Sequence, residues 1–215
     1  TRREADDYIQ SGRVFVNNKL VEKLGLKISL NDEVKVDGDL ILPYNFHYLL
    51  LNKPLDFDFN ISGKKNVLNL MSSLNAINLR PIQTTVKQFS GLVLISNDNQ
   101  FNNGISKRFN SFKQLFHIKL KNVISIEDLN SIKNSSDSNN IEIISIDFVT
   151  DGLKNELGLE VSSAKLSSIL NLFEKYGHKV VSIDRVMLAG LSKKDLPRGK
   201  WRLLKKQELI NLNSF

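Results

Sequence analysis

Short strand-like and helix-like segments alternate along most of this 215-residue chain. β-branched and apolar residues predict strands over 48–52, 92–96, 112–120, 141–149 and 179–186. Helical periodicity predicts helices over 66–74, 99–109, 126–132 and 163–176. The last helix has an apolar face made of Leu166, Ile169, Leu170 and Phe173. This alternation favours an α+β domain, with helices against a mixed, mainly antiparallel sheet.

The first forty residues have the pattern of a separate small unit. A helix is predicted over 2–9 with Gly12 as its stop, and strands over 13–16 and 33–36. Turns are predicted at Asn17-Asn18 and Asp37-Gly38, and a connector over 39–45. We therefore expect one domain at 1–42 and a second at 46–215. Since Thr1 stands inside helical sequence, we also expect an initial segment to be missing.

The distribution of charge favours a polyanionic partner. The net charge is +7. Residues 99–125 hold five basic residues and no acid, and residues 193–206 hold seven basic residues against Asp195 alone. Solvated surface is the ordinary explanation of such clusters, but two acid-poor segments in one chain favour nucleic acid, because binding to phosphates releases counterions.

Other function classes are disfavoured by composition. The longest apolar runs are too short to span a membrane, and no secretory signal is visible. The absence of cysteine excludes disulfides and thiolate metal sites, and His47, His117 and His178 have no metal-ligand spacing. We expect no metal, no small-molecule cofactor and no membrane partner.

The N-terminal unit matches a known RNA-binding module at several fixed spacings. The matching residues are Arg2-Arg3-Glu4-Ala5, Ile9, Gly12-Arg13-Val14, Val16-Asn17, Leu24-Gly25 and Asp32-Glu33-Val34-Lys35-Val36. On these residues the unit resembles the alpha-L RNA-binding domain, which occurs in the RsuA-like ribosomal-RNA pseudouridine synthases. The resemblance implies that Arg2, Arg3 and Arg13 contact RNA. Surface solubility is the alternative role, since Glu4 and the Asp6-Asp7 pair nearly cancel their charge.

The second domain resembles the catalytic domain of the same family. Five motifs occur in the family's order: Leu50-Leu51-Asn52-Lys53-Pro54, Val67-Leu68-Asn69-Leu70, Ser90 to Asp98, Phe173 to Val180, and Ile183-Asp184-Arg185-Val186 with the ending Leu196 to Leu203. One such match is weak, but five in order are specific. The resemblance implies a pseudouridine-synthase-like fold, with Lys53 and Arg185 near the pocket. A structural role is the alternative for Arg185.

The active-site segment departs from the family pattern. The family sequence reads P-V-G-R-L-D-x-x-T-S-G-L-L-L, and Pro81 and Ser90-Gly91-Leu92 align with it without a gap. Val86 then stands at the catalytic aspartate and Thr84 at the neighbouring arginine. The aspartate acts as a nucleophile or base, which requires an ionisable oxygen that valine lacks.

Other pocket positions depart in the same direction. Gln114 and Phe116 stand where the family has a lysine and a tyrosine, so Phe116 retains only a ring that could stack on a base. Of the four arginines in a family helix aligned with 163–172, Lys165 alone keeps a charge. We therefore predict a catalytically inactive homologue that binds ribosomal RNA, and ribosomal proteins, as a ribosomal component or assembly factor.

Two alternatives remain open at this point. One is an active synthase that isomerises a uridine in ribosomal RNA with Asp56 or Asp58 as the acid, and the other is a protein-interaction scaffold. The composition, rich in Asn, Ile, Lys and Phe, indicates an AT-rich genome. We expect an intracellular, ribosome-associated protein, in a mitochondrion or plastid rather than in the bacterial cytoplasm. The predicted RNA contacts are Arg2, Arg3, Arg13, Lys53, Lys107, Arg108, Lys113, Lys165, Arg185, Lys193, Lys194, Arg198, Lys200 and Arg202.

Overall fold

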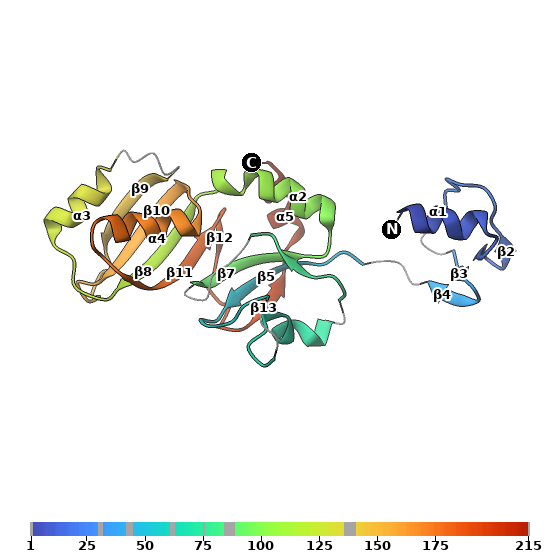
Figure 1. Cartoon of the computed structure of the whole chain (residues 1–215), viewed down its shortest axis with the longest axis horizontal. Helices are drawn as coiled ribbons and strands as arrows, with labels where there is room; N and C mark the ends of the chain where they lie inside the picture. Colours follow the sequence, from blue (N-terminus) through green and yellow to red (C-terminus); the bar gives the residue numbers. More distant parts are fainter. Residues whose placement is uncertain are drawn as a thin grey trace. The chain divides into compact units, whose positions relative to one another are not determined.

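The structure, a computed structural model, describes residues 2–29, 32–41, 45–60, 63–74, 76–83, 89–135 and 141–214. The chain forms two compact units, Thr1–Asn45 and Phe46–Phe215 (Figure 1).

The N-terminal unit is a helix with a small antiparallel sheet. Its elements are α1 (Arg2–Gln10), β1 (Val14–Val16), β2 (Lys19–Leu20), β3 (Val34–Val36) and β4 (Asp39–Ile41), and the strand order is β2-β1-β3-β4. Asn17 and Asn18 have φ of 49° and 61°, as a two-residue hairpin turn requires, which confirms the turn predicted there. The predicted connector over 39–45 is wrong for its first three residues, because Asp39–Ile41 form strand β4. Asp37-Gly38 forms a second turn, and β4 pairs with β3 beyond it.

The second unit is an α+β domain with a mixed sheet. Its strands are β5 (Tyr48–Lys53), β6 (Arg80–Pro81), β7 (Phe89–Ser96), β8 (Gln114–Leu120), β9 (Glu142–Phe148), β10 (Glu156–Ser163), β11 (Val180–Leu188), β12 (Leu191–Ser192) and β13 (Trp201–Leu203). Its helices are the 3₁₀ segments η1 (Val67–Leu74) and η2 (Phe109–Ser111), and α2 (Asn99–Arg108), α3 (Ile126–Lys133), α4 (Leu166–Lys175) and α5 (Lys206–Ser214). The strand order is β13-β5-β7-β11-β8-β10-β9, with β12 on β11 and β6 on β7. Strand β11 pairs in parallel with β7, and the other described pairs are antiparallel, which confirms the predicted fold class.

Hydrophobic clusters pack on both faces of the central strands. Alternate residues of β5 and β7 enter one cluster or the other, so that Leu51 and Leu50, for example, point to opposite faces. Helix α4 contributes to the first cluster, and α2 and α5 contribute to the second (Figure 1). Burial on both faces explains why β7 reads as a continuous, entirely buried run.

Three predictions about elements need correction. The helix predicted over 163–176 begins only at Leu166, because Ser163 ends β10, a strand that was not predicted. Its buried face contains Leu172 in place of Leu170. The helix predicted over 66–74 is a 3₁₀ helix over Val67–Leu74.

Candidate nucleic-acid interface

The degenerate active-site segment joins β6 to β7. Val86 and Thr84, the two positions on which the prediction of inactivity depends, lie outside the described residues. The surroundings of the segment are described on both sides, from Gln83 before it to Phe89 after it.

Gly91 allows β7 and β11 to approach closely just after this segment. It pairs with Arg185 in the parallel ladder and has a φ of +93°. A Cβ at Gly91 would stand 2.6 Å from the backbone nitrogen of Arg185, and closer still to its carbonyl oxygen and to Asp184 Oδ1. The glycine of the Ser90-Gly91-Leu92 motif is therefore required for strand packing.

Arg185 lies in an aromatic box and contacts Gln83 and Phe89, the described residues on either side of the degenerate segment. Its side chain is 2% exposed, and its guanidinium carbon lies 4.8, 5.2 and 5.5 Å from the ring centres of Phe89, Phe109 and Phe116. Nη1 donates to the Leu92 carbonyl at 3.2 Å and Nη2 to Gln83 Oε1 at 2.9 Å. Burial lowers the pKa of Arg185 to about 9, so the side chain is still a cation at pH 7. No carboxylate of the described residues pairs with it.

Lys53 is a second buried cation beside Phe89. Its Nζ donates to the carbonyls of Phe89 at 2.6 Å and Pro54 at 3.2 Å. Burial lowers the pKa of Lys53 to about 8, against the opposing effect of the nearby Asp58 and Asp56 carboxylates. Lys53 and Arg185 were predicted as RNA contacts. This is corrected, because both side chains are enclosed and bound to the protein itself.

Asp56 and Asp58, the predicted substitute acids, differ in their surroundings. Asp56 is exposed, has a φ of 62° and lies 3.7 Å from Lys65 Nζ. Asp58 is half-buried and accepts a hydrogen bond from the backbone of Asn60 at 3.2 Å. Of the two, Asp58 has the larger effect on the pKa of Lys53.

The residues aligned with the family's lysine and tyrosine lie in the domain interior. Gln114 and Phe116 on β8 are 0% and 1% exposed. The only partner of the Gln114 amide among the described residues is the Ala164 carbonyl, at the long distance of 3.5 Å. Phe116 packs in the core and against Arg185, so the prediction that its ring is free to stack on a base is corrected.

Three of the basic residues predicted over 193–202 form ion pairs within the domain. Asp184 accepts hydrogen bonds from Lys193 at 2.6 Å and from Arg198 at 3.0 and 2.7 Å. Burial acts to raise the pKa of Asp184, but these donors outweigh it and the pKa is lowered. Arg202 forms a two-point ion pair with Glu208 at 2.7 Å for both contacts. Their role as phosphate contacts stays a prediction, with their charges partly compensated, and Arg198, Lys194 and Lys200 are exposed.

The arginine network also connects β5, β11 and the segment before β13. Arg198 donates to Asn52 Oδ1 at 2.8 Å as well as to Asp184, and Asn52 Nδ2 donates to the Leu196 carbonyl at 2.7 Å. These roles were not predicted. The available signal was that Asn52, Asp184 and Arg198 lie in three motifs that match the family together.

Three predicted RNA contacts gather around the N-terminal end of β8. Lys107 is in the last turn of α2, Lys113 directly precedes β8, and Lys165 directly precedes α4. The bond from Gln114 to Ala164 brings the neighbours of Lys113 and Lys165 together. All three lysines are exposed, and no acid of the described residues pairs with them. We call them the lysine face. Arg108 beside them is half-buried and bonded to Asn213.

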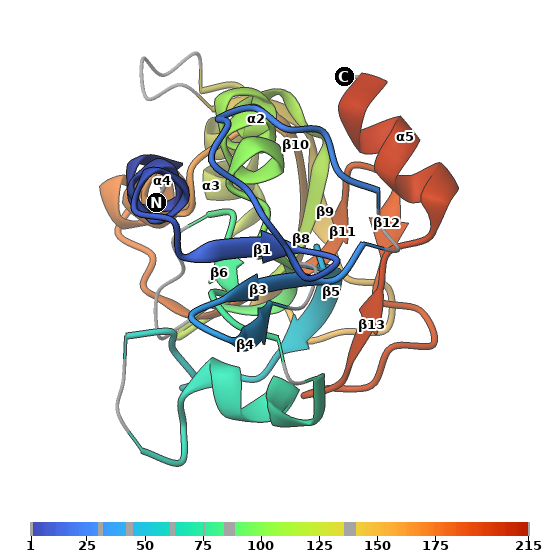
Figure 2. The same cartoon turned by 90° about the vertical axis from the view of Figure 1, so that its right-hand side faces the viewer.

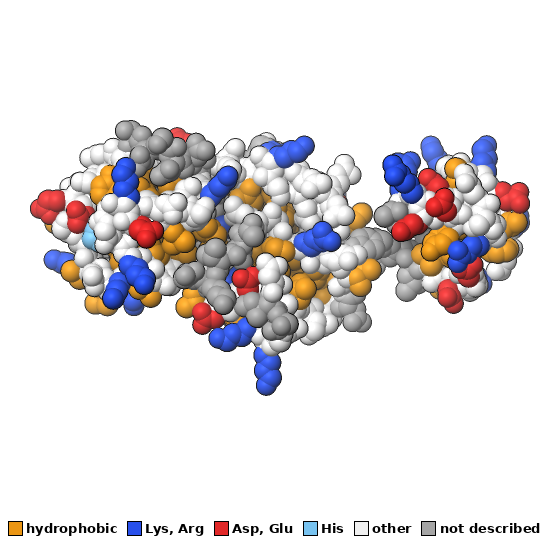
Figure 3. All heavy atoms as spheres, in the orientation of Figure 1, with side chains coloured by type: hydrophobic (Ala, Val, Ile, Leu, Met, Phe, Trp, Pro, Cys, Tyr) orange, Lys and Arg blue, Asp and Glu red, His pale blue; other side chains and the backbone are white. Residues whose placement is uncertain are grey.

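The N-terminal unit has mixed charge on its surface. Figure 3 shows basic and acidic side chains interleaved on it. Arg2 and Arg3 are exposed on α1, whereas Arg13 pairs with Asp37 through a bond of 2.8 Å from Nε and lies 4.5 Å from the Tyr8 ring centre. Arg13 is thus held in place, and its charge is partly compensated.

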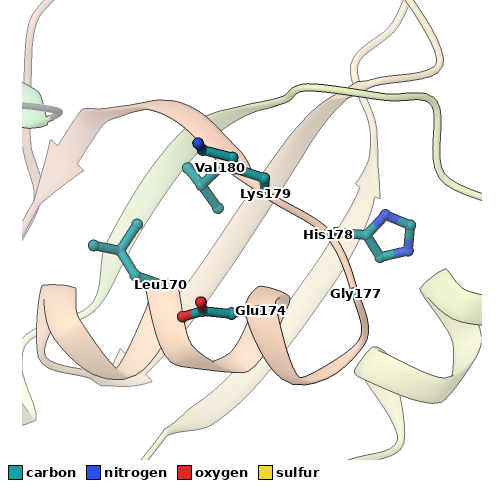
Figure 4. Close-up of a pocket in the computed structure, with 6 residues that line it drawn as sticks. All are labelled: Leu170, Glu174, Gly177, His178, Lys179 and Val180. Carbon is teal, nitrogen blue, oxygen red and sulfur yellow. The ribbon is translucent and has the colours of Figure 1, made fainter.

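A hollow of about 460 Å³ lies between α4 and the start of β11 (Figure 4). Its lining residues are Leu170, Glu174, Gly177, His178, Lys179 and Val180. The His178 ring points toward α3, where it lies 3.1 Å from Asp128. None of the predicted site residues lines this hollow. Among the described residues, no helix is long and apolar enough to cross a membrane, and no three His, Asp or Glu side chains gather as metal ligands.

Comparisons with known proteins find an S4 domain in the N-terminal unit and RNA pseudouridine synthases as relatives of the whole chain. The S4 domain family matches residues 1–34. An uncharacterised RNA pseudouridine synthase of Aquifex aeolicus is 25% identical, covering 99% of this chain and 88% of that protein. The ribosomal large subunit pseudouridine synthase B of Bacillus subtilis is 25% identical, covering 100% and 91%. The dual-specificity RNA pseudouridine synthase RluF of Escherichia coli K12 is 27% identical, covering 99% and 73%.

A solved structure shows the same fold. The crystal structure of a pseudouridylate synthase superposes with a TM-score of 0.62 at 19% identity, covering 99% of this chain and 94% of that one. The fold predicted from the ordered motifs is thereby confirmed.

Proposed function

We propose that this chain, in which an S4 domain precedes a domain homologous to RsuA- and RluF-type RNA pseudouridine synthases, binds ribosomal RNA without isomerising a uridine. In this proposal it acts as a ribosomal component or as an assembly factor, beside ribosomal proteins, and in an organelle rather than in the bacterial cytoplasm.

The observation that carries the loss of catalysis is the environment of Arg185. A buried guanidinium next to an active-site segment ordinarily has a carboxylate partner, because an unpaired buried charge is costly. Here its side-chain partner is the neutral amide of Gln83, and its other neighbours are three phenylalanine rings. Together with valine at position 86, the neutral partner of Arg185 supports the proposal that this segment has lost its catalytic acid.

RNA binding is supported independently of the pocket. The S4 match covers the unit that holds Arg2, Arg3 and Arg13, and the relatives are named as RNA-modifying enzymes. The lysine face adds three exposed charges with no acidic partner among the described residues, and two of them, Lys107 and Lys113, lie in the acid-free segment 99–125. Phosphate contacts of this kind give affinity without sequence recognition.

A second candidate function is an active synthase that uses Asp58. The observation in its favour is that Asp58 lies near enough to the buried Lys53 to raise the pKa of that lysine. A carboxylate paired electrostatically with a buried cation is a plausible acid–base group.

We predict that the purified full chain forms no pseudouridine in unmodified ribosomal RNA. The reason is that Val86 offers no nucleophile or base. The measurement is pseudouridine mapping at single-nucleotide resolution after incubation at a concentration where RNA binding is saturated. Stoichiometric modification that depends on the protein would overturn the proposal.

The same assay separates the two candidate functions. If modification is seen, Asp58→Ala and Asp56→Ala are compared. Loss of activity in Asp58→Ala alone establishes the second candidate, and activity in both variants excludes both of these acids. The matched control is Asp151→Ala, an exposed acid in the turn between β9 and β10.

We predict that replacing Lys107, Lys113 and Lys165 with alanine weakens RNA binding and flattens its salt dependence. Each lost phosphate contact lowers the slope of log K against log salt by about 0.7 for single strands, so the triple variant should lose about 2. The control variant removes Lys121, Lys154 and Lys179, three exposed lysines near the other end of β8. Equal slopes for the two triple variants would contradict a specific role of the lysine face.

A further inference from the structure

A shallow hollow of about 370 Å³ lies between the β11–β12 turn and the C-terminal end of α5. It is lined by Ala189 and Gly190 from the turn and by Asn211 and Ser214 from the helix. Figures 1 and 2 show α5 beside β12, on the side of the domain where α2 also lies. The hollow shares no lining residue with the aromatic box around Arg185.

One side of the hollow is the two-residue turn Ala189-Gly190, whose residues both have positive φ. Ala189 has a φ of 47°, a conformation that few residues other than glycine adopt, and Gly190 has a φ of 79°. No heavy atom stands within 4 Å of where a Gly190 side chain would begin. The Ala189 N–H donates to the Lys113 carbonyl at 2.9 Å, which fixes the turn against the start of β8. Because Gly190 has no side chain, a ligand can approach the backbone closely at that residue.

Two basic residues are bonded to the elements that form the hollow, Lys113 through its carbonyl to Ala189 and Arg108 to Asn213. Lys113 is exposed and has no acidic partner among the described residues. Arg108 donates to the carbonyl and Oδ1 of Asn213 at 3.0 and 3.4 Å, so its partners are neutral groups. The only acid of α5, Glu208, is engaged by Arg202. Arg108 also offsets the partial negative charge at the C-terminal end of α5.

The helix side of the hollow offers hydrogen-bonding groups. Asn211 accepts from Gln207 through Oδ1 at 2.9 Å, which leaves its Nδ2 group as a donor. Ser214 donates to the Ile210 carbonyl at 2.9 Å, which leaves its oxygen as an acceptor. A donor and an acceptor side by side suit the edge of a nucleobase, and the cations suit a phosphate.

We infer that this hollow is a subsite for one nucleotide of single-stranded RNA, with the phosphate at Lys113 and Arg108 and the base edge at Asn211 and Ser214. The inference rests on the proposed RNA-binding function. It adds where on the domain a nucleotide binds and that the bound RNA is single-stranded. A single strand fits because an unpaired nucleotide can enter a hollow of this size, whereas a duplex presents only its outer surface.

The test compares Asn211→Glu with Asn171→Glu in the full chain. Both replace an exposed helical asparagine, on α5 and α4 respectively, and both change the net charge by the same amount. The probes are a fluorescein-labelled uridine-rich decamer and a duplex of equal length. We expect Asn211→Glu to weaken binding of the single strand roughly tenfold and of the duplex less than twofold. We expect Asn171→Glu to change both by less than twofold.

A crosslinking experiment gives the position directly. The decamer carries 4-thiouridine, and adducts are mapped by mass spectrometry on the unaltered chain. We expect adducts on residues 189–190 and 211–214. Equal loss of affinity in both variants, or adducts confined to other residues, would overturn the subsite while leaving RNA binding intact. An occupant that is a protein gives this same negative result. Absence of binding by the unaltered chain would instead overturn the proposed function itself.

Discussion

Replacing Gly91 with alanine is expected to lower the free energy of unfolding by roughly 4 kcal/mol, as the sum of backbone strain and overpacking. The strain arises because φ at Gly91 is +93°, where a Cβ is poorly tolerated. The overpacking arises because the added carbon would meet the backbone of Arg185 and the carboxylate of Asp184. Neither neighbour can retreat, since both belong to β11 at the centre of the sheet and Asp184 is held by Arg198.

Urea unfolding followed by circular dichroism measures this effect, as a lower midpoint at an unchanged m-value. Gly158→Ala is the matched control, because Gly158 is also a glycine within the same sheet. A Cβ at Gly158 would stand 4.0 Å from its nearest neighbour, the Asp147 carbonyl oxygen, and its φ is not positive. We expect this control to lie within about 0.5 kcal/mol of the unaltered chain. A loss at Gly91 no larger than at Gly158 would show that the two strands can separate without cost.

The role of Gly91 shows what a motif can and cannot reveal. The Ser90-Gly91-Leu92 match predicted a pseudouridine-synthase-like fold with a strand there, and both the fold and the strand are confirmed. The strand partner was hidden, because β11 begins about ninety residues later and pairs with β7 only in the folded sheet. Local patterns define strands, whereas strand neighbours depend on how the whole sheet assembles.

The basic residues show a second limit of sequence reasoning. Counting charges over 193–206 suggested a phosphate-binding segment with Asp195 as its only acid. Two acids that pair with three of its seven basic residues lie outside that stretch, Asp184 on β11 and Glu208 on α5. By contrast, the acid-free segment 99–125 retains exposed lysines, because no distant acid folds back onto Lys107 or Lys113 among the described residues. Whether a basic residue has an acidic partner depends on which residues the fold brings together, and a count along the sequence does not show it.

β10 went unpredicted although its signal was present. Leu157, Leu159 and Val161 alternate with polar residues and point into the first core cluster. Gly158 between the first two weakens the strand pattern, since glycine lowers strand propensity. Pairing with β8 on one side and β9 on the other outweighs that preference.

The burial of Lys53 could not be predicted from the sequence either, because a lysine in a motif gives no indication of which residues pack over it.

The buried Lys53 makes the stability of the domain depend on pH in an unusual direction. Its pKa falls from 10.5 to about 8 in the folded chain, because burial disfavours the charged form. Between pH 8 and 10.5 the unfolded chain therefore binds more protons at this lysine than the folded chain does, and the contribution of Lys53 to stability rises with pH through that window. The gain amounts to about 3 kcal/mol, at 1.36 kcal/mol for each pKa unit.

Lys53→Met isolates this contribution, since methionine fills a similar volume and carries no charge. We expect the unfolding free energy of the unaltered chain to rise by about 3 kcal/mol relative to Lys53→Met between pH 8 and 10.5, measured by urea unfolding at half-unit intervals. Below pH 8 the difference between them should be constant, because the lysine is then protonated in both states. Lys64→Met, at an exposed position, should run parallel to the unaltered chain throughout. If the pH dependence of the unfolding free energy of Lys53→Met also ran parallel to that of the unaltered chain, the Lys53 ammonium group would reach water in the folded state. Position 53 would then regain its predicted role as an RNA contact, since a solvated cation beside the degenerate segment is free to meet a phosphate.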